Sequence, residues 1–400
     1  MFRRHFAVLL LLGLLLSGCG GLSAPAPITA NTFTPEAENL TAADGFPVHT
    51  HLRYARAFTV EYRESYKVLT VLKPWRGAEV TFTYILVQRG TPAPQNTGDA
   101  QVIEVPVRSL ASLATTHLPY LEKLDDLDSL VAIGNAQYVN TPGVAARLQA
   151  GSLKAAGNGP DVNLEILLET NPEMITTFAL GSSGKDDYRL LMQKGFNVVV
   201  FSDYMEESPL GRAEWIKFMA LFFNQEEEAE RIFSGIEQRY NEVAALAAGV
   251  TERPTVLLGF EINGNWNVPG GNSYQAAYVK DAGGNYLWAD EESAGRIPMS
   301  FEAVYARGRA ADFWFDQSVS WQTGADVLAA DVRYQNFAAF APGRVYNNNA
   351  RLNPTGGNDY NESGLVNPDL VLADLVSILH PYLLAEHELV YYRPLLDEGE

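Results

Sequence analysis

The chain of 400 residues is poor in cysteine and histidine, with one Cys and six His. A single cysteine cannot form a disulfide within the chain, so a disulfide-stapled fold is excluded. Basic residues are also scarce: 29 Lys and Arg stand against 48 Asp and Glu, for a formal net charge of −19. Because nucleic acid would repel such a surface, we expect no nucleic-acid partner. The acidity suits docking onto a basic protein face, and it equally suits simple solubility.

Long apolar runs are confined to the N-terminus. The segment "MFRRHFAVLLLLGLLLSGCG" has Arg3 and Arg4, then an apolar run over 6–16, then small residues. This is the pattern of a signal peptide, and the run is short for a membrane span. It ends in "LSGC", which resembles a bacterial lipobox, a signal whose cysteine is lipidated and becomes the first mature residue. We therefore predict a lipid anchor on Cys19 and a location in the cell envelope, at the periplasmic or extracytoplasmic face of a membrane.

The composition beyond this segment is that of a globular protein, with 47% hydrophobic residues and 11% aromatics. After the predicted signal peptide of 1–18, residues 19–50 are rich in Ala, Pro, Thr and Asn without apolar periodicity, which indicates a flexible tether. Strand and helix patterns alternate over 51–223 and again over 251–400. This alternation predicts two α/β lobes with parallel sheets.

Between the lobes, residues 224–250 predict one long helix. Asn224 and Glu227 have the spacing of a capping box. At 1.5 Å per residue, 225–248 would span roughly 36 Å, about the width of a small domain. One apolar stripe runs along this helix: Ala229, Ile232, Phe233, Ile236, Tyr240, Val243 and Ala247.

Taken together, these motifs resemble the substrate-binding proteins of ABC importers for iron–siderophore complexes, haem and cobalamin. The resemblance covers most of residues 55–395 and rests on motifs such as "VNLEILLETNPEMITT", "DYMEESPLGRAEWIKFMALFFN" and "GNSYQAAYVKDAGGNYLW" in this order. It implies the helical-backbone periplasmic-binding-protein fold: two Rossmann-like lobes joined by a rigid interdomain helix, with a ligand cleft between them. It also implies a monomeric receptor without intrinsic cofactor or catalytic residues, which passes a ferric siderophore to an ABC permease.

The resemblance implies two docking residues as well. In this family each lobe offers a surface glutamate to an arginine-lined pocket of the permease. The motif "DVNLEILLETNPEMI" places Glu165 in that role on the N-terminal lobe, and "MSFEAVYARGRAADFWF" places Glu302 in it on the C-terminal lobe. Two distant carboxylates would orient the receptor on two guanidinium sites. The structural alternative is that a first-turn glutamate simply stabilises the helix dipole.

Loops that follow the predicted strands are expected to line the cleft, because ligands bind at the carboxyl ends of parallel strands. Bulky ligands prefer aromatic walls with a few fixed polar groups. An inward arginine would meet an anionic siderophore, although pairing with Glu207 or Glu214 is an alternative for a helical Arg212. The predicted ligand-binding residues are Tyr138, Tyr204, Trp266, Tyr274, Trp321, Arg212 and Arg351.

Other functions are disfavoured rather than excluded. Haem or cobalamin stays open as the ligand within the same class. A metal-ion receptor needs several His, Asp or Glu ligands from both lobes, but His49 and His51 lie at the edge of the tether, and a lone His117 is more often structural. The acidic "FSDYMEE" segment would suit an enzyme, yet the sequence has no nucleophile elbow, phosphate-binding glycine loop or His–carboxylate motif. The sequence therefore predicts a binding protein.

Overall fold

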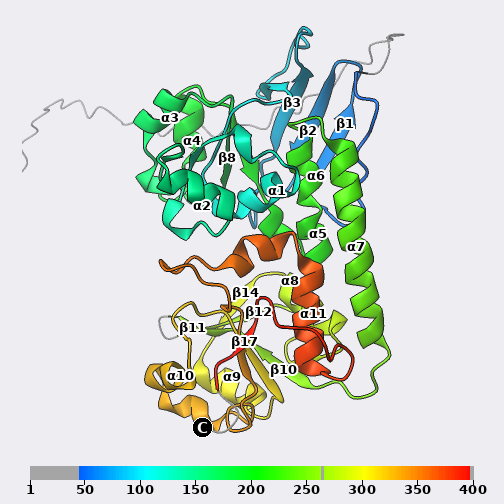
Figure 1. Ribbon diagram of the computed structural model, residues 1–400, viewed down its shortest axis with the longest axis vertical. Helices are drawn as coiled ribbons and strands as arrows, with labels where there is room; N and C mark the ends of the chain where they lie inside the picture. The colour runs from blue at the N-terminus through cyan, green and yellow to red at the C-terminus, as the bar shows by residue number, and fades with distance from the viewer. Residues whose placement is uncertain (1–44, 263–264, 397–400) are drawn as a thin grey trace, which may run out of the picture. The chain divides into compact units, whose positions relative to one another are not determined.

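The computed structural model describes residues 45–262 and 265–396 (Figure 1). These residues belong to one compact unit, Thr32–Glu400. Cys19, the predicted signal peptide and most of the predicted tether lie outside the described residues, so lipidation stays a prediction. Among the described residues, none of the helices is both long enough and apolar enough to cross a membrane.

A four-stranded sheet comes first in the chain. Its strands are β1 (Phe58–Tyr62), β2 (Tyr66–Val71), β3 (Phe82–Gln88) and β4 (Gln101–Val105), in that spatial order. The first three pair antiparallel, and β4 runs parallel to β3. Phe46, which is within the predicted tether, is buried with its ring 6.1 Å from that of Tyr62, so packing onto this sheet begins before residue 51.

The N-terminal lobe is built on a five-stranded parallel sheet in the order β7-β6-β5-β8-β9. Chain order reverses between the neighbours β5 and β8, which opens a crevice at their carboxyl ends. The strands are β5 (Leu110–Ser112), β6 (Leu130–Ile133), β7 (Lys154–Ala155), β8 (Met174–Phe178) and β9 (Val198–Phe201). The helices are α1 (Leu118–Lys123), α2 (Pro142–Gln149), α3 (Leu164–Thr170) and α4 (Tyr188–Gln193).

The C-terminal lobe has a second five-stranded sheet, in the order β13-β10-β15-β16-β17, in which only the β16–β17 pair is antiparallel. Its strands are β10 (Thr255–Leu258), β13 (Asn285–Tyr286), β15 (Phe313–Asp316), β16 (Val345–Asn347) and β17 (Arg393–Pro394). A small antiparallel sheet adds β11 (Phe260–Ile262), β12 (Asn265–Pro269) and β14 (Arg296–Met299). The helices are α8 (Tyr274–Asp281), α9 (Phe301–Gly308), α10 (Gly324–Ala330) and α11 (Pro368–Leu379).

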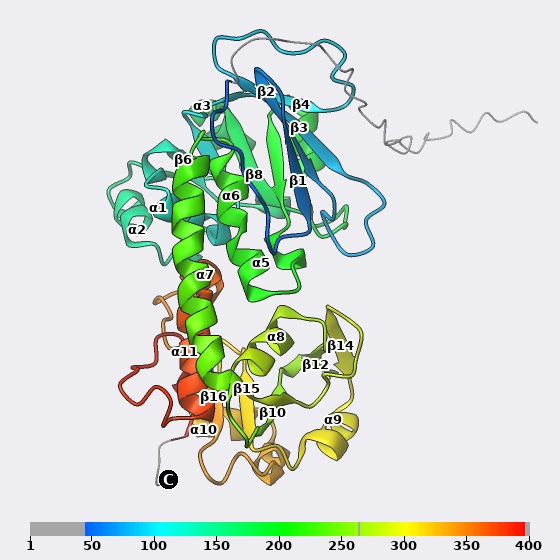
Figure 2. The same ribbon diagram turned by 90° about the vertical axis from the view of Figure 1, so that its right-hand side faces the viewer.

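The two halves share one long helix, α7 (Glu226–Ala248), of 23 residues. It follows the short helices α5 (Pro209–Ala213) and α6 (Trp215–Ala220) and packs on α6, α8 and α11 (Figure 2). The mixed α/β architecture with parallel sheets and this helix confirms the predicted fold class. The lobe boundaries at residues 51, 224 and 251 stay predictions.

The predicted capping box at the start of α7 is wrong. The N-cap is Gln225, without a side-chain hydrogen bond, and Asn224 adopts a left-handed φ of 55°. The Asn224 amide is used elsewhere: it accepts a bond from Lys67 Nζ at 2.8 Å and donates to Gln88 at 2.9 Å. Lys67 is fully buried and also pairs with Glu226, the first residue of α7. A contact between residues 157 positions apart therefore replaces the local cap.

Glu214, at the junction of α5 and α6, holds the segment before β1 in place. Its carboxylate is fully buried and accepts the backbone N–H groups of Arg53, Tyr54 and Ala55 at 2.9, 2.7 and 2.8 Å. It also accepts a bond from Lys217 Nζ at 2.9 Å. Buried amides and a buried ammonium are costly unless paired, so this one carboxylate joins the N-terminal segment to the lobe.

We predict that Glu214→Ala destabilises the chain by about 3–5 kcal/mol, because it leaves three backbone amides without their acceptor and removes one of the two carboxylates that pair with the buried Lys217. Urea unfolding measures the change. The control is Glu228→Ala, which removes an exposed helix ion pair with Arg231 and leaves the midpoint nearly unchanged. Equal stability of the two variants would contradict the anchoring role.

Candidate functional site

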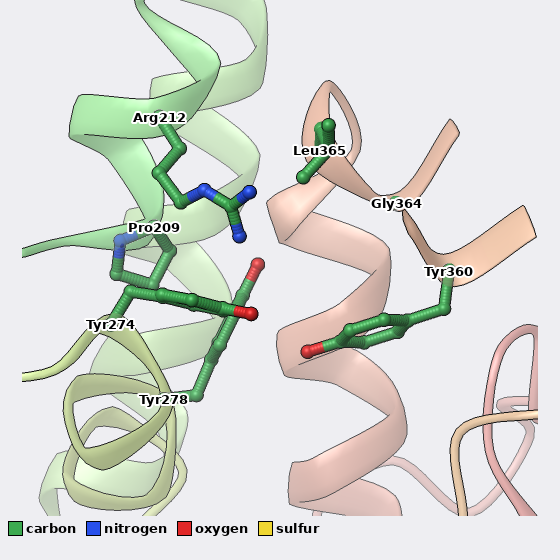
Figure 3. Close-up of a pocket in the computed structure, with 7 residues that line it drawn as sticks. All are labelled: Pro209, Arg212, Tyr274, Tyr278, Tyr360, Gly364 and Leu365. Atoms are coloured by element: carbon green, nitrogen blue, oxygen red, sulfur yellow. The ribbon is translucent and has the colours of Figure 1, made fainter. Parts of the chain in front are cut away.

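A pocket lies where α5 of the N-terminal lobe contacts α8 of the C-terminal lobe (Figure 3). The other lining residues come from two 3-10 helices of the C-terminal lobe, η7 (Asp359–Asn361) and η8 (Ser363–Leu365). The cavity volume is about 10 Å³, which is room for about one water molecule. Its lining residues are Pro209, Arg212, Tyr274, Tyr278, Tyr360, Gly364 and Leu365.

Arg212 is the charged group of this pocket. Its position follows from the start of α5, where Ser208 accepts the N–H of Gly211 at 3.0 Å and Pro209 occupies the first turn. The guanidinium lies 4.2 Å from the ring centroid of Tyr274 and 3.5 Å from Asp203. Arg212 therefore pairs with Asp203, not with the Glu207 or Glu214 of the sequence alternative.

Arg212 keeps its charge although it is buried. Only 12% of its side chain is exposed, and its Nε has no hydrogen-bond partner in the described structure. Burial lowers the pKa of Arg212, but the facing Tyr274 and Asp203 more than offset this, and the net direction is upward. A charged donor with an unused N–H at a pocket wall suits an anionic or carbonyl-bearing ligand.

Three phenols face Arg212. Tyr274 and Tyr278 lie one turn apart on α8 and Tyr360 lies on η7; Figure 3 shows their hydroxyl groups pointing toward one another. Burial raises the pKa of Tyr278 and of Tyr360 well above the usual value, so both stay protonated at neutral pH. The pocket thus presents hydroxyl donors and acceptors beside one cation.

Asp316 ends β15 at the carboxyl edge of the C-terminal sheet, where α/β folds bind ligands. It is fully buried and lines a second small cavity with Tyr278, Tyr360 and Tyr392. Burial raises the pKa of Asp316 to about 7, against the lowering effect of two backbone N–H groups and the Arg296 charge. Its Oδ1 has no hydrogen-bond partner in the described structure.

A second set of bonds joins the two lobes beside the pocket. Glu362, only 1% exposed, accepts the N–H and the hydroxyl of Thr141 at 2.6 and 2.5 Å. Thr141 is the N-cap of α2, so a carboxylate from the C-terminal lobe satisfies the start of an N-terminal helix. Asn353 also donates to the carbonyl of Gln137 at 3.0 Å.

Of the seven ligand residues predicted from the sequence, the structure brings only Arg212 and Tyr274 together in this pocket. Tyr138 is 44% exposed, next to the contact between Asn353 and Gln137. Tyr204 donates its hydroxyl to the carbonyl of Ala179 at 2.5 Å.

The other three predicted residues lie in the C-terminal lobe. Arg351 is exposed and pairs with Asp359 at 2.7 Å. Trp266 and Trp321 are 0% and 7% exposed and pack around Trp314, with ring centroids at 5.4 and 5.8 Å. A ligand would reach these two indoles only after this aromatic cluster had opened.

Sequence reasoning missed Tyr278. Its spacing of four residues from Tyr274 on one helix was the available signal, since such residues share a helix face.

Glu165 and Glu302 occupy equivalent places in the two lobes. Each is exposed in the first turn of a helix that leads into a strand of a parallel sheet. Asn163 caps α3, and Ser300 caps α9. The Glu302 side chain is 76% exposed and lies 3.6 Å from Arg333.

Within the described residues, no cluster of three or more His, Cys, Asp or Glu side chains is arranged to hold a metal ion. His117 is buried, with Nδ1 at 3.2 and 3.0 Å from the hydroxyls of Ser112 and Thr176. Burial lowers the pKa of His117 to about 3, so it stays neutral at physiological pH. These contacts agree with the structural interpretation of this histidine.

Two α/β lobes that share one long helix and enclose a polar, aromatic pocket define a two-lobed solute-binding protein. A family model described as periplasmic binding protein matches residues 110–352, more than half of the chain, and the chain belongs to this family. Its members are substrate-binding proteins that bind small molecules and work with ABC permeases.

Relatives and solved structures agree with this assignment. An uncharacterized lipoprotein of Methanocaldococcus jannaschii is 27% identical over 74% of this chain and 72% of its own length; a second is 25% identical over 96% and 97%. A crystal structure of a periplasmic heme binding protein from Pseudomonas aeruginosa has a TM-score of 0.51 at 20% identity, covering 69% of this chain and 93% of that one. At that identity the likeness shows the fold alone.

We predict that Asp316→Asn changes how stability depends on pH. Because the folded-state pKa of Asp316 lies above its ordinary 3.8, the carboxyl favours folding at low pH, and this contribution is lost as the pH rises through about 7. The loss amounts to roughly 4 kcal/mol at most, since one pH unit corresponds to about 1.4 kcal/mol. Urea unfolding should therefore show that the free energy of unfolding of Asp316→Asn, relative to the unchanged chain, is higher at pH 8 than at pH 5. Asp290→Asn, at an exposed pair with Arg307, is the control and should show no such gain. A parallel pH dependence in Asp316→Asn and the unchanged chain would contradict the prediction.

Proposed function

We propose that the chain is an extracytoplasmic receptor that binds a ferric siderophore between its lobes and delivers it to an ABC permease. The observation that carries this proposal is the meeting of Arg212 from one lobe with Tyr274, Tyr278 and Tyr360 from the other. Ferric siderophores are bulky and commonly anionic, and they expose carbonyl or phenolate oxygens. A buried cation with aromatic walls and hydroxyl donors is complementary to such a surface.

The cavity as it stands is far too small for such a ligand, so binding requires the pocket to open. The contacts that would have to yield are the Arg212–Tyr274 stacking and the bonds of Glu362 to Thr141. Both are polar contacts that water can replace, whereas the apolar packing of α7 can be kept. We therefore expect a modest movement of the lobes about α7, in the manner of hinged binding proteins.

Haem is the second candidate, because a tyrosine phenolate can act as an axial ligand of haem iron. Three phenols at the pocket make this chemistry available. Cobalamin stays the alternative of the same class. We propose no catalytic activity and no intrinsic cofactor. A receptor for a bare metal ion and an enzyme are the alternatives outside this class.

Glu165 and Glu302 are the proposed contacts to the permease, and Cys19 is the proposed site of the lipid anchor of a monomeric receptor. Exposure of both carboxylates in matching first turns supports the docking role. The relatives named lipoproteins support the anchor.

We predict that Arg212→Met and Tyr360→Phe each weaken ligand binding by about tenfold or more, because each removes a polar contact in a buried pocket. Quenching of tryptophan fluorescence on titration with ferric siderophores, haemin and cyanocobalamin measures affinity. A Soret band in the complex would identify haem. The control is Arg309→Met, which changes an exposed arginine outside the pocket lining. If the unchanged chain binds none of these compounds, the proposed function is wrong.

We predict that Glu165→Lys combined with Glu302→Lys abolishes uptake while ligand affinity stays within about twofold, since both carboxylates are exposed and separate from the pocket lining. Cellular uptake of the labelled ligand and co-purification with the permease are the readouts. Glu169→Lys, at another exposed position of α3, is the control. A parallel fall in ligand affinity would assign these residues to the cleft or to folding instead of docking.

A further inference from the structure

The four-stranded sheet β1–β4 precedes residue 110, where the match to the family model begins. The loop that joins β2 to β3, residues 72–81, leaves this sheet toward the strand ends of the N-terminal lobe. In Figure 2 it lies on the same side as β14 of the C-terminal lobe. We call residues 72–81 the β2–β3 loop.

On the N-terminal lobe the β2–β3 loop is fixed at the carboxyl ends of β8 and β9. The carbonyl of Pro74 accepts the hydroxyls of Ser202 and Tyr204 at 3.3 and 3.1 Å. Trp75 packs directly on Gly181, where an added Cβ would lie 2.6 Å from the indole Nε1. These contacts place the loop at the edge where α/β sheets bind ligands.

The tip of the loop also reaches the C-terminal lobe. An added Cβ on Gly295 would lie 2.7 Å from Cζ of Arg76, so the guanidinium rests against this glycine. Arg296, the next residue, begins β14 and donates to Gln317 Oε1 at 2.8 Å. The charge of Arg296 lowers the pKa of Asp316, so Arg296 lies near the carboxyl end of β15.

Neither arginine has an ion-pair partner among the described residues, although the chain carries a net charge of −19. Arg76 is exposed, and its charge acts on the phenol of Tyr204. Two cations left without carboxylate partners on facing lobes of an acidic protein are available to a negatively charged ligand.

We propose that Arg76 and Arg296 form an anion-binding flank of the ligand cleft, so that the β2–β3 loop selects a chelate bearing carboxylates or catecholates over a neutral one. This inference rests on the proposed function and names the charge class of its ligand. Trp75 fixes the loop on the N-terminal lobe, and the Arg76 guanidinium rests against Gly295 of the C-terminal lobe.

The test compares Arg76→Ala, Arg296→Ala and the unchanged chain with three probes: ferric citrate, a ferric tris-catecholate and the neutral cyanocobalamin. Dissociation constants come from calorimetry at low and high salt. The matched control is Arg63→Ala, an arginine of the same sheet at the opposite end of β2, paired with Glu61 on the surface. Unfolding midpoints confirm that all variants are folded.

We expect each of the two variants to lose about 10- to 100-fold in affinity for an anionic probe, with the loss shrinking at high salt, and Arg63→Ala to lose nothing. Unchanged binding of the anionic probes by Arg76→Ala overturns the inference and leaves the proposed function standing. An equal loss for charged and neutral probes does the same, because Arg76 would then be only a lobe-to-lobe contact. Binding of cyanocobalamin alone overturns both the inference and the proposed ferric siderophore. Failure of the unchanged chain to bind any probe overturns both.

Discussion

The packing of α7 sets the geometry on which the candidate site depends. Its first turn is tied to the N-terminal sheet by the buried pair of Lys67 and Glu226. Further along, Tyr240 donates to Asp281, the last residue of α8, at 2.6 Å, and Arg239 bonds Asp369 in the first turn of α11. Because α8 carries two tyrosines of the pocket, the same helix that positions the N-terminal lobe also orients the phenols opposite Arg212. A 23-residue helix anchored in this way bends little, so relative movement of the lobes has to be small.

The contacts that join the two lobes beside the pocket are polar, unlike the apolar packing of α7. The bonds of Glu362 to Thr141 are polar but buried, whereas Arg76, which contacts Gly295, is exposed. Opening the pocket has to break these bonds, and the net cost of each stays near ~1 kcal/mol only if water or a ligand replaces the lost partner. The molecule therefore combines a long helix, held by apolar packing and by polar pairs, with polar contacts between the lobes that a ligand would have to displace. That combination is what a receptor needs if it must both hold and release its cargo.

Much of the fold followed from local patterns. Periodicity predicted α7. The caps of α3 and α5 are Asn163 and Ser208, residue types that favour N-caps because capping is local chemistry. The capping box predicted at Asn224 was wrong because the side chain of Asn224 accepts a hydrogen bond from Lys67, which lies 157 residues away in the chain. The site was less predictable. An indole after a strand can face the cleft or the core, and nothing within the neighbouring residues of Trp266 distinguishes the two; the cluster around Trp314 decides it.

Two buried polar atoms at the two small cavities have no protein hydrogen-bond partner among the described residues. Arg212 Nε and Asp316 Oδ1 both lack partners in the described structure, and an unsatisfied buried polar atom costs about 1–3 kcal/mol. The fold sustains these costs because the aromatic packing around them is extensive, and Asp316 reduces its own cost by binding a proton near neutral pH. A ligand that supplies an acceptor to Arg212 removes part of the penalty at once.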